Sequence, residues 1–155
     1  MEIILVVAIT MLPFLELRAS IPYAIFGLGM HWLAAMLVCI TANALLGIIV
    51  FVLINKIVGV LLKVDALNRF YNRKVERTQE KIKRYVDRYG LLGVSLFIGI
   101  PLPGTGSWTG ALGSWLLGIK FRKFAVANFI GVAIAGAIVT AVCVAGGGAF
   151  NIFIK

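Results

Sequence analysis

Glu16 and Arg18 are the residues of this chain whose chemistry fits their surroundings least well. They stand two positions apart in a segment that is apolar on both sides. A carboxylate inside a membrane is costly unless it is paired, protonated or exposed to water. We therefore expect Glu16 to couple a proton or another cation to function, and Arg18 to bind an anionic group. The alternative is that the two side chains pair with each other or brace the tip of a hairpin.

A second segment, Pro-Leu-Pro-Gly-Thr-Gly-Ser at residues 101–107, has no ionisable side chain. Its prolines free backbone carbonyls, and a helix that begins after it would offer unpaired amides, which attract anions. We expect Thr105 or Ser107 to cap that helix, and Ser20 to begin a similar helix before Pro22. The alternative is a tight turn buried in protein.

The predicted substrate site combines the two segments with two asparagines from apolar helices, which could also serve as hydrogen-bonding contacts between those helices. Its expected members are Arg18, Ser20, Pro22, Pro101, Pro103, Gly104, Thr105, Gly106, Ser107, Asn43 and Asn128.

The composition indicates the kind of structural element that holds these residues in place. The 155-residue chain is 61% hydrophobic with a mean hydropathy of +1.03, and 14% of it is charged, against roughly 25% in soluble domains. Thirteen charged residues fall within residues 63–88, which leaves long uncharged runs at residues 19–55, 89–119 and 124–154. Such runs are long enough to cross a bilayer. We expect one membrane domain over residues 1–155, which excludes a soluble enzyme.

No nucleophile and base pair, metal-ligand cluster or dinucleotide motif stands out in the sequence. We therefore expect no enzymatic activity, no cofactor and no bound metal. The net charge of +9 does not indicate nucleic acid, because most basic residues flank apolar spans, where they favour the cytoplasmic side.

Four apolar blocks follow one another along the chain. Residues 33–62 and 124–154 predict continuous transmembrane helices. Residues 3–30 are interrupted around residues 16–22, and residues 91–118 at residues 101–106, so each is expected to form a re-entrant hairpin of two half-helices. With hairpins that enter and leave on one face, 12 of the 15 Lys and Arg residues share the cytoplasmic side.

The resulting prediction is an all-α integral membrane protein of two inverted repeats, each a hairpin followed by a transmembrane helix, with both termini outside. A basic amphipathic helix at residues 64–89 would join the repeats at the cytoplasmic surface, where anionic lipids attract it. A plain linker and a partner-binding helix are the alternatives for this segment.

The motifs Glu-Leu-Arg-Ala-Ser-Ile-Pro at residues 16–22 and Pro-Leu-Pro-Gly-Thr-Gly-Ser-Trp at residues 101–108 resemble those of the putative small multidrug export proteins. This resemblance covers nearly the whole chain. More distantly, Arg-Tyr-Gly at residues 88–90 and Phe-Ile-Gly-Ile-Pro at residues 97–101 resemble the DedA superfamily. That resemblance implies inverted re-entrant hairpins, proton-linked activity and, in some members, movement of lipid phosphates across the bilayer. The chain departs from the DedA pattern at Ile100 and Thr105, where arginines are expected.

Together these features favour an ion-coupled transporter or lipid flippase of the cell membrane that works by alternating access. Glu16 would couple the ion, while Arg18 and the two tips would bind an anionic headgroup, such as that of a polyprenyl phosphate. Membrane lipids, a small amphipathic substrate and a second copy of the chain are the expected partners. An exporter of cationic drugs with four full spans and a non-transporting scaffold are the alternatives.

Overall fold

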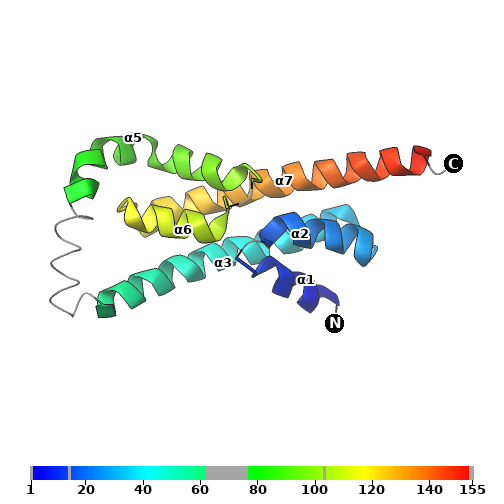
Figure 1. Ribbon diagram of the computed structural model, residues 1–155, viewed down its shortest axis with the longest axis horizontal. Coiled ribbons are helices and arrows are strands. Elements are labelled where there is room, and N and C mark those ends of the chain that lie inside the picture. The colour runs from blue at the N-terminus through cyan, green and yellow to red at the C-terminus, as the bar shows by residue number, and fades with distance from the viewer. Residues whose placement is uncertain (1, 14, 62–76, 103, 154–155) are drawn as a thin grey trace.

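In this computed structural model, residues 2–13, 15–61, 77–102 and 104–153 are described, and they contain helices and no strands (Figure 1). The all-helical prediction is confirmed. In chain order the elements are α1 (Glu2–Thr10), α2 (Glu16–Pro22), the π-helical turn η1 (Tyr23–Gly27), α3 (Trp32–Leu61), α5 (Arg77–Gly99), α6 (Ser107–Leu116) and α7 (Phe121–Phe153).

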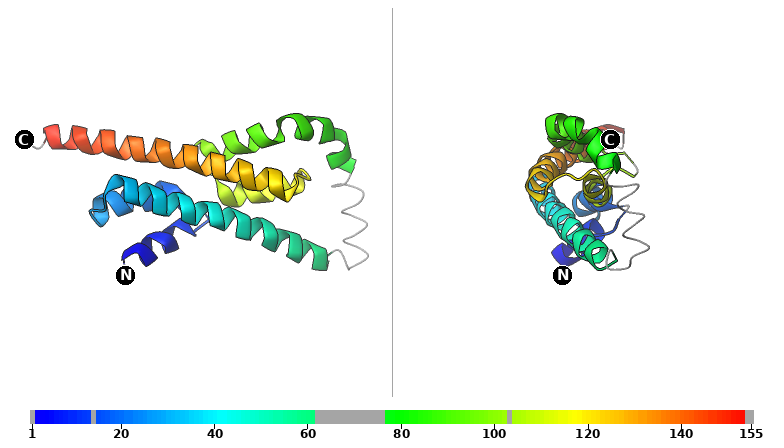
Figure 2. Two further views of the ribbon diagram at one scale, coloured as in Figure 1. Left: turned by 180° about the vertical axis from the view of Figure 1, so that it is seen from behind. Right: turned by 90° about the vertical axis from the view of Figure 1, so that its left-hand side faces the viewer.

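The two longest helices, α3 and α7, form the axis of the molecule. Their segments Trp32–Gly59 and Phe121–Gly146, of 28 and 26 residues, are long and apolar enough to cross a membrane. At about 1.5 Å per residue, each exceeds a hydrocarbon core of about 30 Å. The helices run in opposite directions, as Figures 1 and 2 show. Both predicted transmembrane helices are therefore present.

Each interrupted block contributes to a pair of helices that fold back on each other, and α5, the first helix of the second pair, has 23 residues. The pair α1 and α2 precedes α3, and the pair α5 and α6 precedes α7 (Figure 1). Helices α1, α2 and α6 have 9, 7 and 10 residues. At about 1.5 Å per residue, none of these three covers a bilayer core alone.

The first interruption lies earlier in the chain than predicted. The break falls between α1 and α2, at a turn that includes Pro13, and the segment Glu16–Pro22 is itself helical. The prediction that Ser20 begins a half-helix is therefore wrong. Ser20 lies inside α2 and is buried, and its hydroxyl donates to the Glu16 carbonyl at 2.9 Å.

Pro22 does not stop the helix, because the backbone widens directly after it. The turn η1 begins at Tyr23, and the amide of Leu28 donates to the Tyr23 carbonyl at 3.2 Å. A wider π turn is one of the ways in which a helix adjusts around an irregularity such as proline.

The predicted boundary between a basic amphipathic helix and the second hairpin, near Gly90, is also wrong. Helix α5 continues without a break from Arg77 to Gly99, so the end of the basic segment and the first arm of the hairpin are one helix. A single glycine weakens a helix by only about 1 kcal/mol, which packing can offset. The rest of the predicted basic helix, through residue 76, lies outside the described residues.

The two halves pack on each other in a reciprocal way. The first arm of each hairpin lies along the long helix of its own half, α1 on α3 and α5 on α7. The second arms reach the other half, α6 on α3 and α2 on α7. Small residues permit close approach: a Cβ on Gly131 of α7 would lie 2.7 Å from Ile98 Cβ of α5. Where α3 and α7 meet, the rings of Phe51 and Phe124 stack with centroids 4.7 Å apart.

Candidate functional site

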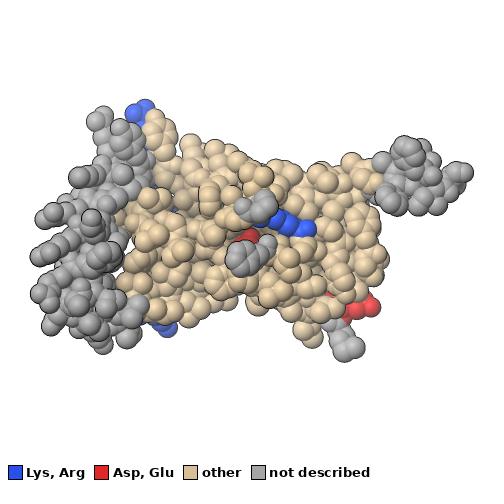
Figure 3. Space-filling model, in the orientation of Figure 1, with Lys and Arg blue, Asp and Glu red and all other residues tan. Residues whose placement is uncertain are grey.

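The turns of the two hairpins meet in the middle of the molecule, and several of the described polar side chains lie close together there. Figure 3 shows blue and red atoms near each other in the centre of an otherwise tan face. The first hairpin contributes Glu16 and Arg18, and the second contributes residues 105–108. We call this meeting point the tip site.

The carboxylate of Glu16 caps the N-terminus of α6. Glu16 is 5% exposed, and its Oε1 accepts the amide hydrogen of Trp108 at 3.2 Å. Its Oε2 accepts the amide hydrogen of Ser107 at 3.3 Å and a side-chain hydrogen of Asn43 at 3.4 Å. Because α6 begins after Gly106, which has no side chain for a cap, Glu16 supplies the acceptor. A negative charge at this end of a helix is favourable.

Glu16 also has a strained backbone. It is the one non-glycine residue with a positive φ, +43°, among the described residues. Such a conformation costs an L-residue about 1–2 kcal/mol. Strain of this kind persists where surrounding contacts fix it, and it concentrates at functional sites.

Arg18 braces the second tip instead of pairing with Glu16. Its Nη2 donates to the Thr105 carbonyl and to Thr105 Oγ1, the latter at 2.8 Å. The Thr105 hydroxyl also lies 2.6 Å from the Ile100 carbonyl oxygen and 2.8 Å from that of Leu102. The guanidinium therefore holds a loop that Thr105 itself closes, and the predicted capping role of Thr105 is wrong.

Asn128 links three helices beneath the tip site. Its side chain is fully buried, donates to the Ala44 carbonyl of α3 at 3.0 Å, and accepts the Ser107 hydroxyl hydrogen of α6 at 2.9 Å. The Ser107 side chain is thus engaged by Asn128 and does not cap its own helix. Asn43 is buried on the other side, and its Oδ1 has no hydrogen-bond partner in the described structure.

The structure brings together seven of the predicted site residues: Glu16, Arg18, Asn43, Thr105, Gly106, Ser107 and Asn128. Ser20 and Pro22 lie within and at the end of α2, while Pro101 and Gly104 belong to the loop between α5 and α6. Pro103 lies outside the described residues. The described chain contains no group of three or more His, Cys, Asp or Glu residues that could hold a metal ion.

Trp108 has a role in the site that was not predicted from the sequence. Its amide binds Glu16, and its indole Nε1 donates to the Met11 carbonyl at 3.3 Å, so Trp108 contacts the first hairpin twice. The available signal was glycine at position 106, since a helix that begins after glycine needs its acceptor from elsewhere.

A family described as "Putative small multi-drug export protein" matches residues 16–138 of the chain. The matched region begins at Glu16 and contains the residues of both hairpins that form the hydrogen bonds to Glu16 and Arg18, all of α3 and more than half of α7. No curated protein and no solved structure matches the chain. The comparisons give no support to the more distant resemblance to the DedA superfamily.

Proposed function

Because the chain belongs to the family of putative small multi-drug export proteins, we propose that it is a proton-coupled exporter whose coupling residue is Glu16. The chain is a membrane protein with two membrane-length helices, and an export family is not a class of enzyme. The coupling step, the topology and the substrate are the parts that we propose.

The contact between Glu16 and α6 is the observation that carries the proposal. The ionised carboxylate accepts hydrogen bonds from two amides of the opposite hairpin, and charged acceptors make the stronger bonds. Protonation removes the charge and turns one oxygen into a hydroxyl, which is a weaker acceptor for an amide hydrogen than a carboxylate oxygen. Proton uptake would therefore loosen the contact between the tips, and proton release would restore it.

The surroundings of Glu16 offer a partner for the protonated form. Asn43 already contacts Oε2, and its own Oδ1 is buried without a partner. A rotation of the Asn43 amide would present that oxygen to a Glu16 hydroxyl, because the two ends of an amide have similar shape and opposite hydrogen-bonding roles. Glu16 then has hydrogen-bond partners in both its ionised and its protonated form, which a proton-coupling residue needs.

We propose that the hairpins are re-entrant and that the halves form an inverted repeat, so that loosening the tips opens the site alternately to each side. The short helices, the opposed directions of α3 and α7 and the reciprocal packing support this topology over four full spans. Four described Lys and Arg residues outside the tip site lie near helix ends that meet at one end of the molecule (Figure 1): Lys56 in the last two turns of α3, and Lys120, Arg122 and Lys123 at the start of α7. We assign this end to the cytoplasm, and Arg88, in the middle of α5, begins the apolar part of that helix.

The proposed substrate is an amphipathic molecule with an anionic headgroup, such as a lipid phosphate. Once Glu16 is protonated, the amides of Ser107 and Trp108 lack a charged acceptor, and Arg18 lies beside them. A helix N-terminus and a guanidinium are both suited to an anion. The exposed large apolar side chains of α3 and α7 would face lipid or a second copy in a homodimer.

Proteoliposomes with a trapped pH-sensitive dye test the proposal. A fluorescent polyprenyl phosphate and the cationic dye ethidium are supplied separately under a pH gradient. We expect proton flux that depends on the phosphate lipid, its loss in Glu16→Gln, and its retention in Glu2→Gln, a control at the exposed glutamate of α1.

Flux that persists in a folded Glu16→Gln protein would remove Glu16 from coupling. Flux with ethidium alone would replace the anionic substrate with a cationic one. If neither probe moves protons, the scaffold alternative gains support.

A further inference from the structure

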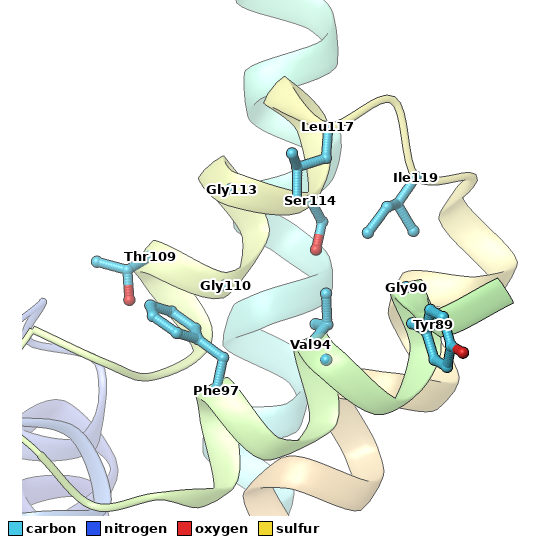
Figure 4. Close-up of a pocket in the computed structure, with 11 residues that line it drawn as sticks. Tyr89, Gly90, Val94, Phe97, Thr109, Gly110, Gly113, Ser114, Leu117 and Ile119 are labelled. Carbon is cyan, nitrogen blue, oxygen red and sulfur yellow. The ribbon is translucent and has the colours of Figure 1, made fainter. Parts of the chain in front are cut away.

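An apolar pocket of about 450 Å³ lies between the arms of the second hairpin, α5 and α6 (Figure 4). Its size falls within the range of about 300–1,000 Å³ that is usual for small-molecule sites. Four glycines form much of its wall, Gly90 and Gly93 on α5 and Gly110 and Gly113 on α6. A Cβ added to Gly93 or Gly113 would meet no atom within 4 Å, so the space beside these two residues is open.

Ser114 distinguishes this pocket from a packing defect. Its side chain is 1% exposed, and its Oγ has no hydrogen-bond partner in the described structure. In Figure 4 the Ser114 hydroxyl points from α6 toward the space between the two helices. An unpaired buried hydroxyl costs free energy, and a polar atom in the pocket would satisfy it.

The lining also restricts the occupant. None of the described residues that line the pocket is charged, so we expect the part of a ligand held there to be uncharged. Lipid tails are as apolar as the walls, so within a bilayer apolar contact alone selects a ligand poorly. A hydrogen bond to Ser114 would favour a ligand with a polar group over a lipid tail.

The pocket is close to the tip site along the chain. Thr109 lines its wall and directly follows Trp108, whose amide holds Glu16. We propose that this pocket binds the apolar body of the transported amphiphile through a hydroxyl group that bonds Ser114, with the headgroup toward the tip site. This inference rests on the proposed export function and specifies its substrate class.

Photolabelling in phosphatidylcholine liposomes tests the proposal without a pH gradient. One probe is a fatty alcohol with a diazirine on its chain, and the other is a phosphatidylcholine with the same diazirine on an acyl chain. We expect the alcohol to label Phe97, Thr109 or Leu117 in the wild-type protein. Gly113→Leu should abolish this labelling by filling the pocket, whereas Gly146→Leu, at an open position on α7, should not.

Ser114→Ala should reduce labelling by the alcohol about five- to tenfold, the value of one hydrogen bond, and leave labelling by the phospholipid unchanged. Gly93→Leu fills the pocket from the opposite wall and replaces Gly113→Leu if that variant does not fold.

Labelling that survives both leucine variants overturns the proposal. Equal labelling by both probes, insensitive to Ser114→Ala, also overturns it by identifying the occupant as bulk lipid. Glu16 is intact in every variant, so failure here leaves the coupling proposal standing.

Discussion

The Oε1 atom of Glu16 accepts a hydrogen bond from the backbone amide of Trp108 at 3.2 Å, although 92 residues separate the two. Most helices are capped by a residue next to their own first turn. Helix α6 instead depends on an acidic side chain from the other hairpin. One ionisable group therefore caps a helix and, beside the Arg18 and Trp108 indole contacts, joins the two hairpins.

Gly106→Ala should destabilise the protein more than Gly104→Ala. Gly106 has a φ of +149°, and a Cβ there would overlap with Glu16 Oε2. Gly104 has a φ of +87°, but a Cβ there would meet nothing within 4 Å. Both variants carry backbone strain of about 1–3 kcal/mol, and only Gly106→Ala also displaces the carboxylate. Thermal unfolding in detergent, followed by tryptophan fluorescence, compares them.

Gly104→Ala is the matched control, because it separates backbone strain from the loss of the Glu16 contact. Equal melting temperatures for the two variants would show that the space beside Gly106 is not needed by Glu16.

Asn128→Ala should destabilise the protein by about 1–3 kcal/mol, because it leaves the Ala44 carbonyl and the Ser107 hydroxyl without their partner. Thr140→Val is the control on the same helix. Thr140 is 3% exposed and its hydroxyl has no partner in the described structure, so its removal should be neutral or stabilising. Denaturation of both variants in mixed micelles measures the difference. A larger loss in Thr140→Val would contradict the assigned network.

The long helices were predictable because their signal is local: an uncharged apolar run of sufficient length has few alternatives to a membrane helix. The position of the first break was not predictable, since the first apolar block contains two prolines, and their effects depend on the backbone around them. Pro13 lies in a turn, whereas Pro22 is accommodated by the π turn that begins at Tyr23. Proline alone does not distinguish these outcomes.

The members of the tip site were largely predictable, but their roles were not. Residue type and an apolar context identified Glu16, Arg18 and Asn128. The partners of these side chains depend on tertiary contacts, and local patterns suggested the wrong ones. Thr105 and Ser107 have hydroxyls at positions suited to a cap, yet Thr105 closes its own loop and Ser107 bonds Asn128.

Arg18 and Thr105 should show strong energetic coupling. The guanidinium donates to both the carbonyl and the hydroxyl of Thr105, so Arg18→Lys, which lacks the planar fork, should lose part of the interaction. A double-mutant cycle of Arg18→Lys and Thr105→Val should give a coupling free energy of about 0.5–3 kcal/mol. Thr105→Ser keeps the hydroxyl and serves as the control. Additive effects of Arg18→Lys and Thr105→Val would mean that the two side chains act independently.

Single cysteines at Arg88 and Lys120 should label from the same side of the membrane. Arg88 precedes the apolar part of α5, and Lys120 precedes α7, so the hairpin of α5 and α6 lies between them. A re-entrant hairpin returns the chain to the face from which it entered, whereas a full crossing does not. Cysteines at Met30 and Gly146, near the opposite ends of α3 and α7, should label from the other side.

The labelling uses a background that lacks Cys39 and Cys143, both buried, and a thiol reagent that does not cross the membrane, applied to intact cells and to inverted vesicles. We expect Arg88 and Lys120 to react in inverted vesicles, and Met30 and Gly146 in intact cells. If Arg88 and Lys120 react from opposite sides, the second hairpin crosses the bilayer. The tip site would then not lie between two re-entrant hairpins that open to opposite faces of the membrane, as the proposed alternating access requires. Export through four full spans would become the better explanation.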